Sequence, residues 1–359
     1  MRVLCVNDLP AGGASGAEVH LALLIDALRR VGDEVHLFTR PPRTGPARLL
    51  DAWDPAARRA LAAAVTRLRP DVLHVHNIVR ELSVSVLGAA PSIPSVLTAH
   101  DGRLLGDADG HGPALRTYQR LRAPVDAAVA RRTVDRVLAV SGPLAARFRA
   151  AGFRSVVHAA PWAAAPTAPL VAATDCTDLV FVGRLDPDKG AHVLLDAFAR
   201  VDHPRARLLL AGTGTGSSRA ALSRSPVVRQ GRAVLLGPLG REDVSRLLAT
   251  ARAVVLPSLP RRRPEGSPLV LAEALVHGRP LVVSDDPGSV ELTHGGACGL
   301  VTPGGDVDAL TAALQRVLTD DELVHRLASA ASAVADGHGE KAGLARVREA
   351  YGHVLDRVA

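Results

Sequence analysis

The chain is poor in cysteine, in aromatic residues and in long apolar runs, and each shortage excludes a class of protein. Three cysteines in 359 residues, Cys5, Cys176 and Cys298, give neither a disulfide framework nor metal-ligand spacing. Aromatic residues make up 3% of the chain, so the stacking platforms of RNA-binding proteins are scarce, and no nucleic-acid recognition motif is present. No apolar stretch approaches the ~18 residues that a membrane span needs. We therefore expect a cytoplasmic globular protein with no nucleic-acid partner.

The positive charge is confined to the first half of the chain. Residues 1–165 hold 21 basic and 14 acidic residues, whereas residues 166–359 hold 22 of each, so the first part carries the whole net charge of +7. Two interpretations stay open. The arginines either coat amphipathic helices in contact with water, or they meet an anionic partner such as an acidic acceptor or a membrane surface.

Short apolar runs alternate with helical patterns along the whole chain, which is typical of a parallel sheet with helices on both faces. The expected strands are residues 2–7, 34–39, 71–75, 95–99, 136–140 and 154–158, then 179–183, 206–211, 233–236, 252–256, 281–284 and 298–301. Residues 159–177 interrupt the alternation with three prolines and many alanines, which predicts a linker. We expect an α/β protein with two doubly wound, Rossmann-like domains and a cleft between them.

The second half contains a motif suited to a diphosphate. The apolar run Val180–Val182 ends in Gly183-Arg184, and Lys189-Gly190 follows just before a helical pattern. Arginine offers phosphate a planar fork of donors, and lysine offers a point charge. Only two of the 43 basic residues are lysine, so a lysine in this loop is itself a signal. Arg184 and Lys189 are therefore the expected diphosphate ligands.

A second motif in the same half places two carboxylates eight positions apart. Glu265-Gly266-Ser267-Pro268 reads as a loop, and the following Leu269–Leu275 reads as a helix that carries Glu273. The free N–H groups at a helix N-terminus suit a phosphate, and a carboxylate in the first turns suits ribose hydroxyls. The segment predicts a site for a nucleoside diphosphate that carries a sugar.

In the first half, Gly16 precedes an expected helix that ends near Gly32, directly after the first strand. A glycine there lets a ligand approach the backbone at the helix N-terminus, whereas an ordinary turn is the alternative. His100 ends the run Ser95–Ala99, where an imidazole can donate a hydrogen bond to a sugar hydroxyl.

These motifs, in this order, resemble the retaining glycosyltransferases of family 4, which have the GT-B fold. The resemblance spans nearly the whole chain. It includes 15–20 (SGAEVH), 71–76 (DVLHVH), 96–101 (VLTAHD) and 299–306 (GLVTPGGD) beside the two motifs above. Ser15 stands where the family has the first of two glycines. The resemblance implies a first domain of residues 1–165 on the acceptor side, with a C-terminal helix at 340–359 packing back on it, and a nucleotide-sugar domain of residues 166–339.

The resemblance implies transfer of a sugar from a nucleoside diphosphate sugar to an acceptor hydroxyl, with retention. The implied catalytic residues are His100, Arg184, Lys189 and Glu265. The implied donor-binding residues are Gly16, Arg184, Lys189, Glu265, Gly266, Ser267, Leu269 and Glu273. The acceptor would be a small molecule, a glycan or a lipid-linked sugar in bacterial natural-product, cell-wall or capsule synthesis.

No cofactor or metal is expected, because two cations already face the diphosphate. Asp186-Pro187-Asp188 is spaced like a metal-binding Asp-x-Asp, but it lies between Arg184 and Lys189. Three other functions stay open. A nucleotide-sugar epimerase of the same fold would bind the donor without an acceptor and would release no nucleotide stoichiometrically with product. A non-catalytic sugar-nucleotide binder is the second, against which intact Arg184, Lys189 and Glu265 argue. A basic membrane-surface or nucleic-acid adaptor is the third, and it would ignore nucleotides and bind in a salt-dependent way. The sequence does not choose the donor base, the sugar or the acceptor.

Overall fold

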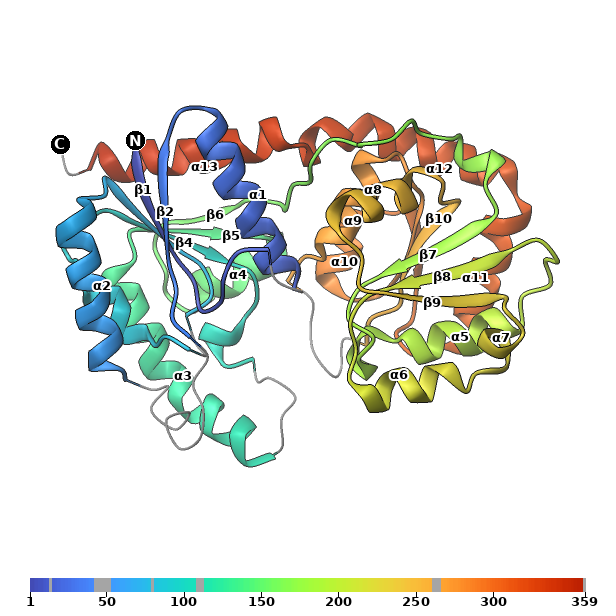
Figure 1. Ribbon diagram of the computed structural model, residues 1–359, viewed down its shortest axis with the longest axis horizontal. Coiled ribbons are helices and arrows are strands. Elements are labelled where there is room, and N and C mark those ends of the chain that lie inside the picture. The colour runs from blue at the N-terminus through green and yellow to red at the C-terminus, as the bar shows by residue number, and fades with distance from the viewer. Residues whose placement is uncertain (13–14, 42–52, 79–80, 108–112, 260–265, 358–359) are drawn as a thin grey trace. The chain divides into compact units, whose positions relative to one another are not determined.

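The computed structural model describes residues 1–12, 15–41, 53–78, 81–107, 113–259 and 266–357. The chain divides into two compact units, and each is described by itself. The first comprises residues 1–161 together with the chain from Gly343 on, and the second comprises Trp162–Ala342. Both are parallel α/β sheets with helices on both sides (Figure 1), which confirms the expected fold class.

The sheet of the first unit has the strand order β2-β1-β3-β4-β5-β6. Every strand residue of β3 and β4 is buried, as expected for central strands with helices on both faces. The strands are β1 (Arg2–Val6), β2 (Glu34–Phe38), β3 (Val72–Val75), β4 (Ser95–Ala99), β5 (Arg136–Ala139) and β6 (Val156–His158). The helices are α1 (Gly16–Arg30), α2 (Pro55–Leu68), α3 (Pro113–Thr133) and α4 (Gly142–Ala150), with α13 (Glu340–Leu355) from the C-terminal part of the chain.

The second sheet has the order β12-β11-β10-β7-β8-β9. Its strands are β7 (Asp178–Val182), β8 (Arg207–Ala211), β9 (Ala233–Gly237), β10 (Ala253–Leu256), β11 (Leu281–Ser284) and β12 (Gly299–Thr302). Its helices are α5 (Ala191–Ala199), α6 (Gly216–Ser223), α7 (Pro226–Arg229), α8 (Arg241–Ala249), α9 (Leu269–Val276), α10 (Pro287–Leu292), α11 (Val307–Thr319) and α12 (Asp321–Val334). Each expected strand overlaps an observed one.

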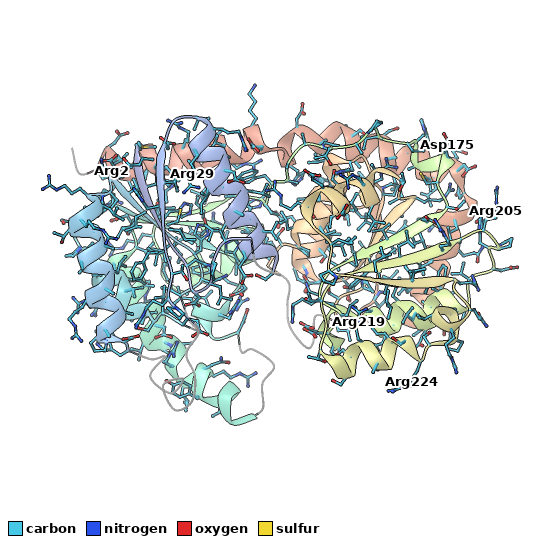
Figure 2. All side chains as sticks on the ribbon, viewed as in Figure 1. Arg2, Arg29, Asp175, Arg205, Arg219 and Arg224 are labelled. Carbon is cyan, nitrogen blue, oxygen red and sulfur yellow. The ribbon has the colours of Figure 1, made fainter. Side chains whose placement is uncertain are left out.

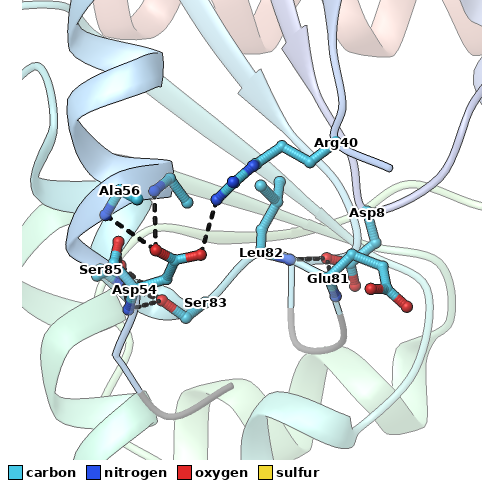
Figure 3. Close-up of polar contacts among 9 residues, drawn as sticks. Asp8, Arg40, Asp54, Ala56, Glu81, Leu82, Ser83 and Ser85 are labelled. Carbon is cyan, nitrogen blue, oxygen red and sulfur yellow. Dashed lines mark hydrogen bonds and ion pairs between the residues drawn. The ribbon is translucent and has the colours of Figure 1, made fainter. Parts of the chain in front are cut away.

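Side-chain caps fix the starts of α1 and α2. Ser15 and Glu18 form a capping box, in which each side chain accepts a hydrogen bond from the other residue's backbone N–H, so α1 begins at Gly16. Asp54 caps α2 by accepting from the N–H groups of Ala56 and Ala57, and it also pairs with Arg40 at 2.8 Å (Figure 3).

The later part of the proline-rich stretch 159–177, from Val171 to Cys176, is docked on the second unit. Arg279 is 1% exposed and donates to three backbone carbonyls, those of Ala251, Ala249 and Val171. Arg252 is 2% exposed and donates to the carbonyls of Thr174 and Cys176. Because buried charges are stable only when hydrogen bonds replace their water, these two arginines tie the stretch to the sheet.

Each unit has its own cluster of buried apolar side chains, and the three cysteines are free buried thiols. The arginines labelled in Figure 2 differ in role. Arg29 donates to the carbonyl of Val35, whereas Arg2 pairs with Glu34 at the surface. No helix within the described ranges is both long and apolar enough to span a bilayer.

Candidate active site

The strand order of the second sheet reverses between β7 and β10. The chain runs outward from β7 through β8 to β9, and then returns to place β10 against the other side of β7. Ligands of open α/β sheets bind outside the carboxyl ends of the strands at such a reversal. Arg184 follows β7 there, and the segment that leads to Glu273 follows β10, so the topology brings the two sequence motifs to the same place.

The loops that follow β7 and β10 touch each other directly. The N–H of Leu259 donates to the carbonyl of Asp188 at 2.7 Å. Gly190 has φ +70°, and a Cβ at this position would lie 2.0 Å from the carbonyl oxygen of Pro257. Only glycine fits this contact, because a side chain would meet both the positive φ and the backbone of the neighbouring loop. The close approach explains the glycine of the Lys189-Gly190 motif.

The guanidinium of Arg184 lies between two carboxylates of its own loop. Its Nη1 pairs with Asp186, and its Nη2 donates to Asp188 at 2.9 Å. The side chain stays 34% exposed, and a guanidinium has five N–H donors, so the pairing fixes its direction and leaves donors for a ligand. Lys189 ends the 3₁₀ turn Pro187–Lys189 beside it and is half-buried.

Arg184 thus forms ion pairs with both Asp186 and Asp188, the two residues that are spaced like a metal-binding pair. Among the residues that the structure describes, no cluster of three or more His, Cys, Asp or Glu side chains could hold a metal ion.

Glu273 lies on α9, one turn beyond the helix start. Leu269 opens the helix and is buried, and the residue before it, Pro268, supplies no side-chain cap, so first-turn N–H groups receive no bond from it. Burial raises the pKa of the Glu273 carboxyl to about 7, and the nearby Arg241 opposes the rise. The raised pKa favours the neutral form of this carboxyl below pH 7.

The other expected residues of this segment are only partly described. Gly266 and Ser267 lie directly before Pro268 and are half-buried. Glu265, expected beside the sugar, and the arginines at 261–263 lie outside the described residues.

A hydrogen-bond chain anchors the far end of α9. The carbonyl of Glu273 accepts from Nδ1 of His277 at 2.7 Å, so this ring carries its proton on Nδ1. Its Nε2 then accepts from the hydroxyl of Ser245 at 2.9 Å, and the Ser245 oxygen accepts from the N–H of Thr167. These hydrogen bonds connect α9, which carries Glu273, to Thr167 in the stretch 159–177.

In the first unit, Gly16 and His100 lie at the same end of the sheet. Gly16 is the first residue of α1 and is exposed, and His20 one turn later meets the His100 ring edge-on at 5.5 Å between centroids. His100 directly follows β4 and is half-buried. Burial lowers the pKa of His100 to about 4, and Asp101 opposes this shift, so the imidazole is neutral near pH 7. The carboxylate of Asp101 accepts a hydrogen bond from Nε of Arg103 at 2.7 Å.

Four residues to which the sequence analysis gives no role belong to the same group as His100: His20, Tyr351, and His74 and His76 of the motif 71–76. Nδ1 of His76 lies 3.1 Å from Nε2 of His100, and His74 stacks on His76. The His74 ring also reaches Tyr351 of α13, 277 positions away. For His20 a signal exists in the sequence, since it lies four residues after Gly16 and so on the same helix face. For Tyr351 we find none.

Comparison with known proteins assigns both halves of the chain. Residues 14–162 match the family model Glycosyltransferase Family 4, and residues 176–320 match the model Glycosyl transferases group 1. A glycogen synthase of Mycobacterium tuberculosis is 30% identical over 300 residues, which cover 78% of this chain and 70% of that protein. A D-inositol 3-phosphate glycosyltransferase of Thermobispora bispora is 28% identical, covering 97% and 92%.

Solved structures show the same fold. A sucrose-phosphate synthase from Thermosynechococcus elongatus superimposes with a TM-score of 0.80 at 20% identity, covering 99% of this chain and 100% of that one. Anabaena HepE in complex with UDP-glucose gives 0.75 at 21% identity, covering 98% and 100%. The chain therefore belongs to glycosyltransferase family 4, within the group 1 glycosyl transferases, and it has the GT-B fold.

Proposed function

We propose that this glycosyltransferase moves a sugar from a nucleoside diphosphate sugar to an acceptor hydroxyl with retention at the anomeric carbon. The observation that carries the proposal is the position of Arg184, a preoriented cation at the strand-order reversal, beside a loop joined to the segment that leads to Glu273. The UDP-glucose in the related Anabaena structure supports a donor of this class.

In the proposed reaction, Arg184 and Lys189 bind the diphosphate and neutralise the charge that grows on it as the glycosidic bond breaks. Fixed donors aimed at developing charge are usually the largest contribution to catalysis. The two carboxylates on Arg184 hold its fork in place before the donor arrives, so little reorganisation is needed. The two cations then do the work that a divalent metal does in other transferases, and we propose that no metal takes part.

Glu273 accepts the ribose hydroxyls in this proposal, and the ionised carboxylate is the stronger acceptor. Because its pKa is raised to about 7, donor binding includes the loss of a proton at slightly acid pH. The N–H groups of Gly266 and Ser267, with Leu269 at the start of α9, face the sugar side, and Glu265 orients the sugar itself.

In the first unit, His100 donates a hydrogen bond to a hydroxyl of the transferred sugar. Its neutral ring at pH 7 offers one N–H donor without placing a second positive charge near the anomeric carbon. The N-terminus of α1 at Gly16 lies at the same sheet end and offers backbone N–H groups to the ligand.

Product analysis tests the proposal. A panel of nucleoside diphosphate sugars is incubated with polyol and sugar acceptors, and nucleotide release and the anomeric proton coupling of the glycoside are followed by NMR. We expect nucleotide release equal to glycoside formed, with the donor's anomeric configuration preserved. Arg184→Ala should abolish both signals, whereas Arg207→Ala should not, because Arg207 pairs with Asp178 at the opposite end of the same strands.

Two results would contradict the proposal. An inverted product would exclude retention. A donor whose sugar changes configuration without stoichiometric release of nucleotide would show an epimerase instead.

A further inference from the structure

A column of aromatic side chains runs through the interior of the first unit to His100. Tyr351 of α13, 0% exposed, places its hydroxyl 2.6 Å from Nδ1 of His74. The other ring nitrogen of His74 lies 2.7 Å from the hydroxyl of Thr98 on β4. With both nitrogens engaged, the His74 ring has one orientation.

His76 lies between His74 and His100 and contacts both rings. It stacks on His74 at 4.4 Å between centroids, with 26° between the ring planes. It also stacks on His100 at 5.4 Å and 22°, and its Nδ1 lies 3.1 Å from Nε2 of His100. His76 is 2% exposed and, with His100, lines a cavity of about 30 Å³. The fixed His74 ring therefore restricts the orientation of His76, and His76 in turn restricts the orientation of His100.

The burial of His76 favours one position for the proton between the two rings. Its Nε2 is buried and has no hydrogen-bonding partner in the part of the chain that the structure describes. A neutral His76 that carried its proton on Nε2 would leave a buried N–H donor orphaned, which is the rarer and costlier defect in proteins. With its proton on Nδ1, His76 donates to Nε2 of His100 and leaves no buried donor without a partner. In that arrangement His100 carries its own proton on Nδ1.

We propose that His76 is a positioning residue for glycosyl transfer, which holds the His100 ring and keeps its Nε2 unprotonated so that Nδ1–H is presented to a sugar hydroxyl. The proposal rests on the function proposed above for His100. It also gives the C-terminal helix a part in the site, because Tyr351 secures the first ring of the column.

The charge state of the column agrees with this arrangement. Burial lowers the pKa of His74 to about 3 and that of His76 well below its ordinary value, and the neighbouring rings add to both shifts. All three rings are neutral near pH 7, so one proton lies in the hydrogen bond between His76 and His100. A tautomer fixed in this way does not change over the neutral range.

Histidine ring NMR tests the tautomer directly and does not depend on enzymatic activity. In the parent protein labelled with ¹⁵N at its 14 histidines, the His100 signals are assigned by their loss in His100→Ala. We expect His100 to be protonated on Nδ1, and His76→Leu to release this preference. Protonation on Nε2 in the parent would overturn the proposal, whatever the transferase assay shows.

The transferase assay tests whether the arrangement matters for the reaction. His76→Leu should lower kcat by about tenfold with a smaller change in KM, because a misdirected donor weakens mainly the transition state. His76→Asn, whose amide can donate from near the position of Nδ1, should recover most of the loss. In a His100→Ala background, His76→Leu should have no further effect.

A matched control separates positioning from general stability. His338→Leu removes the second histidine pair of this kind, in which His294 and His338 lie 2.9 Å apart in the other unit, and it should leave kcat near the parent value. The proposal fails if His76→Leu transfers like the parent, or if it loses the same factor with and without His100. If the parent protein transfers no sugar from any donor tested, the proposed function is refuted. The NMR experiment would still decide the tautomer of His100.

Discussion

Replacing Glu273 with glutamine should make the protein more stable and a weaker donor binder. The carboxyl has an ordinary pKa of 4.5 and a folded pKa of about 7, because burial penalises its charged form more than Arg241 compensates. Between these two values the native state keeps a proton that the unfolded chain has released, so the free energy of unfolding falls as the pH rises through this window. Above pH 7 the full cost is present.

The pKa difference sets the size of the effect. At 1.36 kcal/mol for each pKa unit, the ionised carboxylate costs at most about 3 kcal/mol, and the partial exposure of Glu273 makes this an upper limit. Glutamine has nearly the same shape and never ionises. The stability gained by Glu273→Gln should therefore be close to zero near pH 4.5 and should rise to a plateau by about pH 8.

Urea unfolding of the parent and of Glu273→Gln across this pH range measures the difference. Glu322→Gln is the control, since Glu322 is a surface carboxylate on α12 with 87% side-chain exposure, and its profile should follow the parent.

Donor affinity should fall in Glu273→Gln, whereas its stability rises. A nucleoside diphosphate sugar should bind the parent about tenfold more weakly at pH 6 than at pH 8, and this dependence should vanish in Glu273→Gln. Parallel stability curves for the parent and Glu273→Gln would refute the reasoning.

Three further predictions follow from the fold and the charges. Arg279→Leu should lower the free energy of unfolding by about 3 kcal/mol in urea titrations, because three carbonyls lose their donor, whereas the exposed Arg205→Leu should change it little. Chelation with EDTA should leave glycosyl transfer unchanged, and loss of activity that Mg²⁺ restores would contradict the role given to Arg184 and Lys189. If the basic excess of residues 1–165 meets a membrane, the protein should sediment with anionic vesicles and be released by high salt; equal sedimentation with neutral vesicles would refute this.

The strands were predictable because each is short, apolar and set between helical patterns. The start of α1 was predictable as well, since Ser15 and Glu18 have the spacing of a capping box. The ion pairs of Arg184 with Asp186 and Asp188 were not predicted, although the three residues lie in one short loop. Contacts of this kind join near neighbours in the sequence, so they are within reach of sequence analysis.

Other features depend on contacts between distant parts of the chain. The composition of residues 159–177 predicts a linker, but not that Arg252 and Arg279 bind its later part through hydrogen bonds to carbonyls, because such bonds leave no pattern in the sequence. The column from Tyr351 to His100 joins three segments, and only the fold brings them together. The raised pKa of Glu273 arises from its surroundings, since an exposed helix carboxylate has the same sequence signature.

Isothermal titration with a panel of nucleoside diphosphates tests whether Arg184 binds the diphosphate of a nucleotide sugar. The parent should bind at least one of them, Arg184→Ala should bind it about 10- to 100-fold more weakly, and Arg207→Ala should bind like the parent. If no nucleoside diphosphate binds the parent, or if Arg184→Ala binds as tightly as Arg207→Ala, the diphosphate does not lie at this end of β7 and the account is wrong.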